Sequence, residues 1–211
     1  SVLSLKFSPD GRRIVTCSSD DSARVWDVSN ASCLHVLEHG ADVNCAGFSP
    51  DGRWLVTGSA DGQVRIWDAS GAWTQEPLAK GRAAVLTLAY SADRNLVAVG
   101  DDSGAIRLWH LGTKKPAWSA EAHRGGVSSL DFDPTGDRLA SAGGDKAVRL
   151  WDITTGRRLQ TLEGHTDWVR SVAFSPSGKQ LASGGDDKTV ILWQRGLRPG
   201  TAQASGSADS Q

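Results

Sequence analysis

The chain has 211 residues, of which 39% are hydrophobic and 22% are charged, and its formal net charge is −1. This composition excludes an intrinsically disordered chain, and the balance of 23 basic and 24 acidic residues predicts no electrostatic footprint for a nucleic-acid backbone or an anionic membrane. The longest uncharged apolar run, residues 83–90, is far shorter than the roughly 20 residues of a transmembrane helix.

The chain contains three cysteines, Cys17, Cys33 and Cys45. This odd number, without paired metal-ligand spacing, favours free thiols in a reducing compartment over a disulfide framework. We therefore expect a cytoplasmic protein. The first residue is Ser1 and the chain has no methionine, so we also expect it to be part of a longer protein.

Five tryptophans recur at intervals of 41, 42, 42 and 42 residues, each at the end of an alternating apolar stretch. They are Trp26, Trp67, Trp109, Trp151 and Trp193. Repetition with a period of about 20–50 residues is typical of solenoids and propellers. We expect five copies of one unit, with approximate bounds 1–39, 40–80, 81–123, 124–165 and 166–194.

The first unit opens with a strand at residues 2–8, which runs into a turn that contains Pro9 and Gly11. Proline presets φ and glycine tolerates positive φ, so this turn is predicted to be a hairpin between two strands. Similar turns occur at residues 48–52, 132–136 and 174–178. The third unit differs, because residues 90–94 contain neither a proline nor a glycine.

Short β-prone segments make up each unit. In the fifth unit they lie at residues 169–175, 180–184 and 189–193. A fourth segment follows the tryptophan in most units, at residues 33–37, 116–120 and 158–162. Four short strands in each unit, without helical periodicity, predict an all-β fold, a β-propeller of four-stranded antiparallel blades. Residues 195–211, rich in Gly, Ser and Ala, have no β pattern and are expected to form a disordered tail.

The tryptophans and their neighbours give the units a specific resemblance. A Trp-Asp dipeptide or a variant of it ends each unit, at residues 26–27, 67–68, 109–110, 151–152 and 193–194. The variants carry His110 and Gln194 in place of Asp, and a Gly-His pair opens the fifth unit at residues 164–165. The units resemble WD repeats over residues 1 to about 194. The resemblance implies a β-propeller without a cofactor.

In that family the N-terminal strand completes the last blade of the ring. Here the chain opens directly on a first strand and ends after the third strand of its fifth unit. We therefore expect an incomplete ring, with the missing strand and further blades upstream of Ser1, in a seven-bladed parent protein.

The resemblance also implies a structural role for a recurring set of polar residues. A His, a Ser or Thr, an Asp and the Trp of one repeat form a hydrogen-bonded tetrad inside the blade. Three copies are present: His39, Thr57, Asp61 and Trp67; His123, Ser141, Asp145 and Trp151; and His165, Ser183, Asp187 and Trp193. Indole can donate to the hydroxyl, the hydroxyl to imidazole and imidazole to the carboxylate, so few polar atoms stay unsatisfied.

Ser183, His165 and Asp187 are also the residue types of a catalytic triad. A nucleophile needs an oxyanion hole and an open pocket. A site that is copied three times, with a tryptophan bonded to the hydroxyl, is better explained by packing. We therefore predict that the protein is not an enzyme.

Other apparent motifs have simpler explanations. Residues 131–137 partly imitate a calcium loop, but Ala142 stands in the place of the bidentate glutamate. Residues 178–179 resemble the end of a phosphate-binding loop that lacks its first glycine. His35 and His110, outside the tetrads, have no cysteine or second histidine at zinc spacing. We predict neither a metal site nor a cofactor.

The third unit is irregular. Gly81, Val99 and Ser103 stand at its tetrad positions and only Trp109 is kept, while its connecting segment at residues 69–80 is divergent. Two explanations stay open. The blade has drifted because its neighbours stabilise it, or its edge has been reshaped for a partner.

The WD-repeat resemblance implies a scaffold that docks protein or peptide partners, not nucleic acid or membrane, on the loops around the central channel. By repeat position, the predicted partner-binding residues are Asp42, Asn44, Leu86, Asp102, Trp168, Arg170 and Asp186. Trp and Arg are frequent hot-spot residues, so Trp168 with Arg170 and Asp186 is the leading contact patch. We expect the sensor or adaptor end of a larger signalling protein, with an upstream domain.

Two other function classes stay open. A catalytic propeller would need carboxylates or metal ligands that do not follow the repeat, and the sequence shows no cluster of them in the loops. A carbohydrate-binding propeller could use Trp73 and Trp118, on outer segments, to stack on sugars. The expected reducing compartment argues against this second class.

Overall fold

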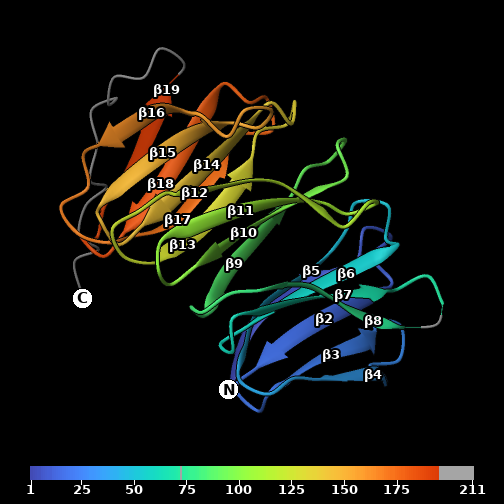
Figure 1. The fold of residues 1–211 in the computed structure, drawn as a ribbon. Coiled ribbons are helices and arrows are strands. Elements are labelled where there is room, and N and C mark those ends of the chain that lie inside the picture. Colours follow the sequence, from blue (N-terminus) through green and yellow to red (C-terminus); the bar gives the residue numbers. More distant parts are fainter. Residues whose placement is uncertain (72, 195–211) are drawn as a thin grey trace, which may run out of the picture.

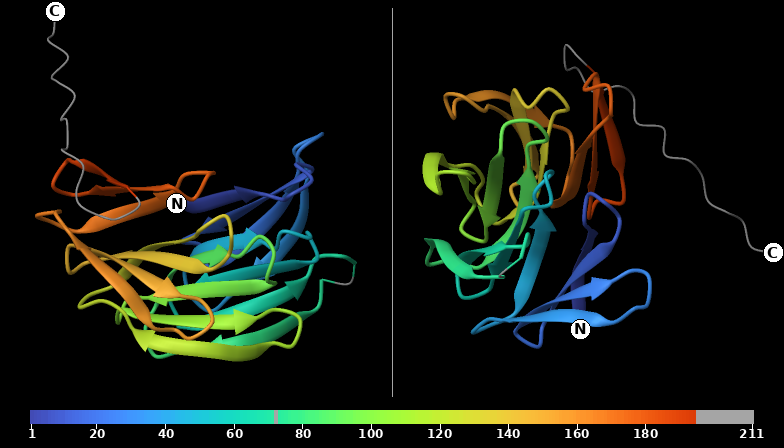
Figure 2. Two further views of the ribbon diagram at one scale, coloured as in Figure 1. Left: turned by 90° about the horizontal axis from the view of Figure 1, so that it is seen from above. Right: turned by 90° about the vertical axis from the view of Figure 1, so that its right-hand side faces the viewer.

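The computed structural model describes residues 1–71 and 73–194, so the predicted tail at residues 195–211 lies outside the described part of the chain. The regular structure of the described residues is β, and its nineteen strands form five antiparallel sheets that follow one another in chain order (Figures 1 and 2). These sheets are the blades of the predicted propeller, so the fold class is confirmed. No helix in this part of the chain is long and apolar enough to cross a membrane.

The strands of each blade run in chain order from the innermost to the outermost. The first blade contains β1 (Val2–Phe7), β2 (Arg13–Ser18), β3 (Ser22–Asp27) and β4 (Cys33–Glu38). The second contains β5 (Val43–Phe48), β6 (Trp54–Ser59), β7 (Gln63–Asp68) and β8 (Gln75–Lys80). The third contains β9 (Val85–Tyr90), β10 (Leu96–Asp101), β11 (Ala105–His110) and β12 (Lys115–Glu121).

The fourth blade contains β13 (Val127–Phe132), β14 (Arg138–Gly143), β15 (Ala147–Asp152) and β16 (Arg158–Glu163). The fifth contains β17 (Val169–Phe174), β18 (Gln180–Gly185) and β19 (Val190–Gln194). The expected strands of the fifth unit agree with these bounds to within a residue. The divergent segment at residues 69–80 still provides an outer strand, β8, and Pro77 is tolerated there because β8 is an edge strand.

The turn between the two innermost strands explains why most units keep a glycine. Gly11, Gly52 and Gly136 have φ values of 70°, 69° and 69°, in the left-handed region where a Cβ atom is unfavourable. In the third blade the left-handed residue is Asn95, with φ of 52°. Asn tolerates this conformation better than most residues do. The turn that lost its proline and glycine therefore persists with its left-handed residue one position later.

The hydrophobic core lies between consecutive blades. Val15 and Val25 of the first blade pack with Leu55 and Trp67 of the second, and all four side chains are buried. Equivalent clusters join the second blade to the third, the third to the fourth and the fourth to the fifth. Burial of one such Val or Leu contributes roughly 1.5–3 kcal/mol, so each blade depends on its neighbours for stability.

The two end blades each leave an apolar face uncovered. Val190 and Leu192 of β19 are 65% and 53% exposed, whereas Val148 and Leu150, at the same register of the fourth blade, are 0% and 4% exposed. Phe7 of β1 is 58% exposed. Each inner strand packs against the inner strand of the next blade, but β1 and β17 make no comparable contact. The described residues therefore do not close the ring.

Candidate functional site

One side of the blades, which we call the loop face, carries all the predicted partner-binding residues. It consists of the connections between blades, at residues 39–42, 81–84, 122–126 and 164–168, and of the turns at residues 19–21, 60–62, 102–104, 144–146 and 186–189. The turns with proline and glycine lie on the opposite side, which we call the hairpin face.

A β-bulge brings one extra residue of each inner strand to the loop face. In the fifth blade Val169 pairs with Gly185 and Ser171 pairs with Gly184, so Arg170 has no partner in β18. The equivalent extra residues are Leu3, Asn44, Leu86 and Ser128. A bulge redirects a side chain. Three of the predicted partner-binding residues therefore occupy one recurring backbone feature.

The bulged side chains of the second and fourth blades contact the next blade. Nδ2 of Asn44 donates to the carbonyl oxygen of Val85 at 2.8 Å, and Oγ of Ser128 donates to the carbonyl oxygen of Val169. Arg170 turns instead to its own blade. Sequence reasoning missed this feature, because a bulge depends on the register of two strands rather than on one residue type.

Trp168, Arg170 and Asp186 lie together on the fifth blade. Nε of Arg170 donates to both carboxylate oxygens of Asp186 at 2.9 Å, and its Nη2 donates at 2.5 Å. The guanidinium carbon of Arg170 lies 4.5 Å from the centroid of the Trp168 ring. On the other blade, a Cβ atom at Gly144 would come within 2.6 Å of that ring. The indole therefore lies close against the backbone of the fourth blade and beneath a cation.

The remaining predicted partner-binding residues are spread over the second and third blades. Leu86 and Asp102 both adjoin Gly126 of the fourth blade, where a Cβ atom would meet them at 2.8 and 3.0 Å. Asn44 is half-buried and bonded to the third blade, as described above. Asp42 is half-buried on the second blade. The structure thus brings Trp168, Arg170 and Asp186 into one cluster and leaves the other four outside it.

In the fourth blade the four predicted tetrad groups are linked. Nε2 of His123 lies 2.8 Å from Oγ of Ser141, its Nδ1 lies 2.7 Å from Asp145, and Nε1 of Trp151 donates to Ser141 at 2.9 Å. Burial lowers the pKa of His123. Although desolvation opposes it, hydrogen bonds from Arg149 and His123 hold the pKa of Asp145 below its usual value.

The fifth blade repeats this arrangement. His165 lies 2.8 Å from Ser183 and 2.9 Å from Asp187, and Trp193 donates to Ser183 at 2.8 Å. Ser183 is buried, and its hydroxyl is held between indole and imidazole. Both tetrads therefore resemble a triad in composition only, because the hydroxyl that would act as the nucleophile is enclosed.

The tetrad predicted for the second blade is incomplete, which corrects the sequence-based assignment. His39 bonds to Thr57 at 2.8 Å, but its Nδ1 lies 2.9 Å from the carbonyl oxygen of Leu37 and makes no bond to Asp61. The carboxylate of Asp61 is instead paired with Arg65 at 3.0 Å. In this blade a backbone carbonyl oxygen therefore takes the place of the tetrad carboxylate as the partner of Nδ1.

The arginine two residues before the tryptophan was not recognised from the sequence. Arg24, Arg65 and Arg149 pair with the Asp of their own turn, at 2.8, 3.0 and 2.8 Å. In the third blade Arg107 pairs with Asp101 at 2.9 Å. The signal was present, because four of the five repeats carry Arg at this position.

This ion pair replaces the tetrad of the third blade. Asp101 is fully buried and also accepts hydrogen bonds from Ser103 and from the backbone of Ala105. A Cβ atom at Gly81 would lie 3.2 Å from Nη1 of Arg107, so the guanidinium fills the space beside the glycine that replaces the tetrad histidine.

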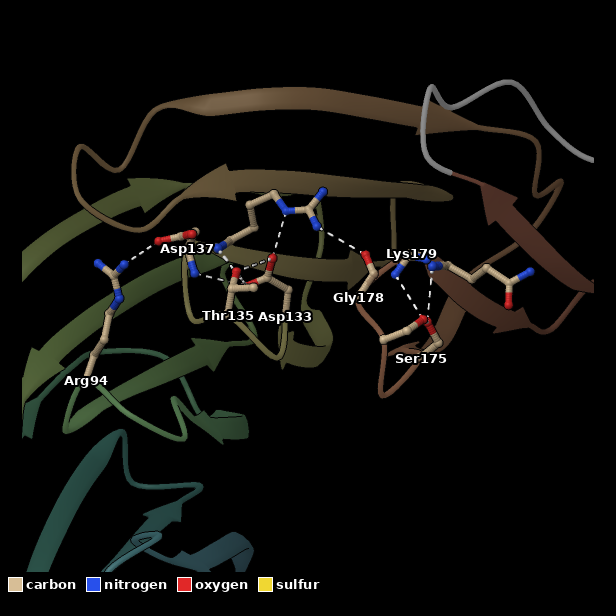
Figure 3. Close-up of polar contacts among 10 residues, drawn as sticks. Arg94, Asp133, Thr135, Asp137, Ser175, Gly178 and Lys179 are labelled. Carbon is tan, nitrogen blue, oxygen red and sulfur yellow. Dashed lines mark hydrogen bonds and ion pairs between the residues drawn. The ribbon is translucent and has the colours of Figure 1, made fainter.

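The part of the chain that the structure describes contains no group of three or more His, Cys, Asp and Glu side chains that could hold a metal ion. In the turn that partly imitates a calcium loop, at residues 131–137, the carboxylate of Asp133 accepts hydrogen bonds from the turn itself. Asp133 accepts hydrogen bonds from the Thr135 hydroxyl and from the backbone of Asp137 and Arg138, and it pairs with the Arg138 side chain at 2.9 Å (Figure 3). Arg94 of the third blade reaches Asp137 from the other side (Figure 3).

The two tryptophans considered for sugar stacking make internal contacts. Trp73 stacks on His35 with 4.3 Å between ring centroids. Nε1 of Trp118 donates to the carbonyl oxygen of Ile153 at 2.7 Å, and its ring stacks on Trp151 at 6.4 Å. These contacts join neighbouring blades, so the structure gives no observation in favour of a carbohydrate site.

The model of the WD domain, G-beta repeat family matches the chain five times, at residues 1–27, 31–68, 75–110, 114–152 and 156–194. A curated relative, the WD repeat-containing protein 26 homolog of Arabidopsis thaliana, is 38% identical over 39 residues. That match covers 18% of this chain and 7% of the relative, so the chain spans a small fraction of the relative's length. WD repeats generally mediate protein–protein interactions and are typically non-catalytic.

Proposed function

We propose that this chain, which belongs to the WD-repeat family, is a non-catalytic scaffold whose loop face docks protein or peptide partners. The observation that supports the site is the cluster of Trp168, Arg170 and Asp186. The side chains of Arg170 and Asp186 are 54% and 40% exposed, yet both are held in place by their ion pair. Ordered side chains lose less conformational entropy on binding, and Trp and Arg are frequent hot-spot residues.

The test is the double variant Trp168→Ala with Arg170→Ala in the intact protein. We expect partner recovery from the native host to be lost, while the β-sheet circular dichroism and the melting temperature stay nearly unchanged. A control for location is Arg53→Ala with Trp54→Ala, a cation–π pair on the hairpin face with 4.8 Å between guanidinium carbon and ring centroid, which should keep partner recovery. Trp54 also packs against the core between the second and third blades, so a lower melting temperature is expected for this control. Undiminished recovery by the first variant would refute the site.

We also propose that further blades of the same protein cover the exposed faces of the first and fifth blades. Val190 and Leu192 support this, because the residues at their register in the fourth blade are buried. The module would then be the sensor or adaptor part of a larger signalling protein with an upstream domain. Sequencing the coding region 5′ of Ser1 tests this arrangement, and a fluorescent fusion at native expression tests the cytoplasmic location.

A further inference from the structure

The charges of the loop face differ between its two ends. The loop-face segments up to residue 62 carry the carboxylates Asp20, Asp21, Asp42 and Asp61, of which Asp20 and Asp61 are paired with Arg24 and Arg65. The connection from the second blade to the third carries the exposed Arg82. The connections and turns of the fourth and fifth blades carry the exposed cations Arg124, Lys146 and Lys188. Of the carboxylates beside them, those of Asp145 and Asp187 are 12% and 5% exposed in their tetrads, and Asp186 is paired with Arg170. Asp167 is the remaining exposed carboxylate of these segments.

The two lysines stand at positions where the backbone is left-handed. Lys146 and Lys188 have φ values of 68° and 64°, in the region that disfavours any side chain. The same position holds Gly62 and Gly104 in the second and third blades. There a Cβ atom would lie 2.6 and 2.0 Å from a backbone carbonyl oxygen, so those blades require glycine. The fourth and fifth blades accept a side chain and both carry lysine.

The segments that carry these cations adjoin the aromatic residue of the candidate site, and the N–H of Asp186, in the turn that holds Lys188, donates to the carbonyl oxygen of Trp168 at 2.8 Å. Nζ of Lys146 donates to the carbonyl oxygen of Thr166 at 2.9 Å, in the connection that leads to Trp168. Arg170 covers one face of the Trp168 ring. Arg124 precedes Gly125, whose added Cβ atom would lie 3.6 Å from the backbone of Gly144 beneath that ring. The half-buried indole thus borders a surface on which the exposed cations outnumber the exposed carboxylates.

We propose that the loop face of the fourth and fifth blades docks an acidic peptide segment of a partner protein, whose carboxylates pair with Arg124, Lys146 and Lys188 beside Trp168. This inference rests on the proposed docking function and names the chemistry of the partner. Charge complementarity favours an acidic segment over a basic one. The carboxylates of Asp21 and Asp42 on the first and second blades would disfavour the same segment there.

The test uses the intact protein and a fluorescein-labelled ten-residue peptide of alternating Glu and Leu, with binding followed by fluorescence anisotropy. We expect Lys146→Gly with Lys188→Gly to weaken binding about three- to tenfold, since two exposed ion pairs are lost. Glycine relieves the left-handed backbone, so the melting temperature should not fall. Lys146→Arg with Lys188→Arg keeps the charge and should keep the affinity. Raising the salt concentration should weaken wild-type binding.

Unchanged affinity in the glycine variant would overturn the proposal, as would equal binding of a matched Lys-Leu peptide. Salt-sensitive self-association that the glycine variant abolishes would also overturn it, because a second copy would then be the occupant. The Trp168 and Arg170 double variant could lose its native partners while the glycine variant keeps them. That result would support the docking function and refute the proposal that the partner segment is acidic.

Discussion

The third and fourth blades have the same strand order but hold their loop-face turns by different polar networks. In the fourth blade His123 connects Ser141 to Asp145. In the third blade the carboxylate comes from Asp101, at the end of β10, and its cationic partner is Arg107. Arg149 makes the equivalent ion pair in the fourth blade. The comparison shows that the carboxylate–arginine pair persists when the histidine is lost.

The third blade leaves its tryptophan N–H unsatisfied, whereas the fourth does not. Nε1 of Trp109 is buried without a hydrogen-bond partner, because Val99 replaces the hydroxyl residue that accepts this N–H in the other blades. An unsatisfied buried donor costs about 1–3 kcal/mol. Loss of the tetrad is therefore only partly offset by the Asp101–Arg107 pair, and the following variants distinguish the two networks.

The largest effect is expected at the left-handed turn position. Gly104→Ala should destabilise the fold by at least about 3 kcal/mol, since its Cβ atom would lie 2.0 Å from the carbonyl oxygen of His123 at a φ of 90°. Lys146→Ala, at the same position of the fourth blade, should cost less than about 0.5 kcal/mol. Chemical denaturation measures both. Equal losses would show that both turns accommodate a Cβ atom equally well.

The next effect concerns the carboxylate of the third blade. Asp101→Ala should cost about 2–4 kcal/mol, because it leaves the Arg107 guanidinium without its partner and removes the acceptor for the Ser103 and Ala105 backbone. Asp101→Asn keeps an acceptor and should cost less. Thermal melting of both variants tests this order, and a smaller loss for alanine than for asparagine would contradict the role of Asp101 as acceptor for the Ser103 and Ala105 backbone.

The tetrad carboxylate of the fourth blade should matter somewhat less. Asp145→Ala is expected to cost about 1–3 kcal/mol, since it removes the partner of a buried imidazole. Ser103→Ala, at the equivalent position of the third blade, should cost less than about 0.5 kcal/mol, because Asp101 keeps its backbone donors and Arg107. Similar losses at both positions in urea titrations would count against the tetrad in the fourth blade.

The sequence predicted the fold and the inner structure of two blades because both follow the 42-residue repeat. The spacing of residues in the repeat could not show which acceptor bonds to Nδ1 of His39. Nδ1 of His39 lies 2.9 Å from the carbonyl oxygen of Leu37, whereas Nδ1 of His123 bonds to Asp145 although Arg149 pairs with that same carboxylate. Repeat positions therefore predict which side chains lie close together. They do not predict which of these side chains form hydrogen bonds with one another.

The candidate docking site was predicted only in part. Residue types and repeat positions indicated Trp168, Arg170 and Asp186, and the structure brings them together. The left-handed φ of Lys146 and Lys188 could not be predicted from the lysines themselves. Their alignment with Gly62 and Gly104 was the available signal, since a glycine in two repeats indicates a backbone that favours it.

The smallest effect is a gain in stability in the third blade. Val99→Thr keeps the β-branched shape and gives Nε1 of Trp109 an acceptor, as Thr57 does for Trp67 at 3.0 Å. The new hydroxyl hydrogen also needs an acceptor, because no histidine is present at position 81.

The first blade shows how that hydrogen can be satisfied without a histidine. There Thr16 accepts from Trp26 at 2.9 Å and donates to the carbonyl oxygen of Arg24 at 3.5 Å. We therefore expect Val99→Thr to stabilise the fold by about 0.5–1 kcal/mol, with Val99→Ala as the control that loses packing and gains no acceptor. A lower melting temperature for the threonine variant than for wild type would mean that the unsatisfied Trp109 N–H does not limit the stability of this blade.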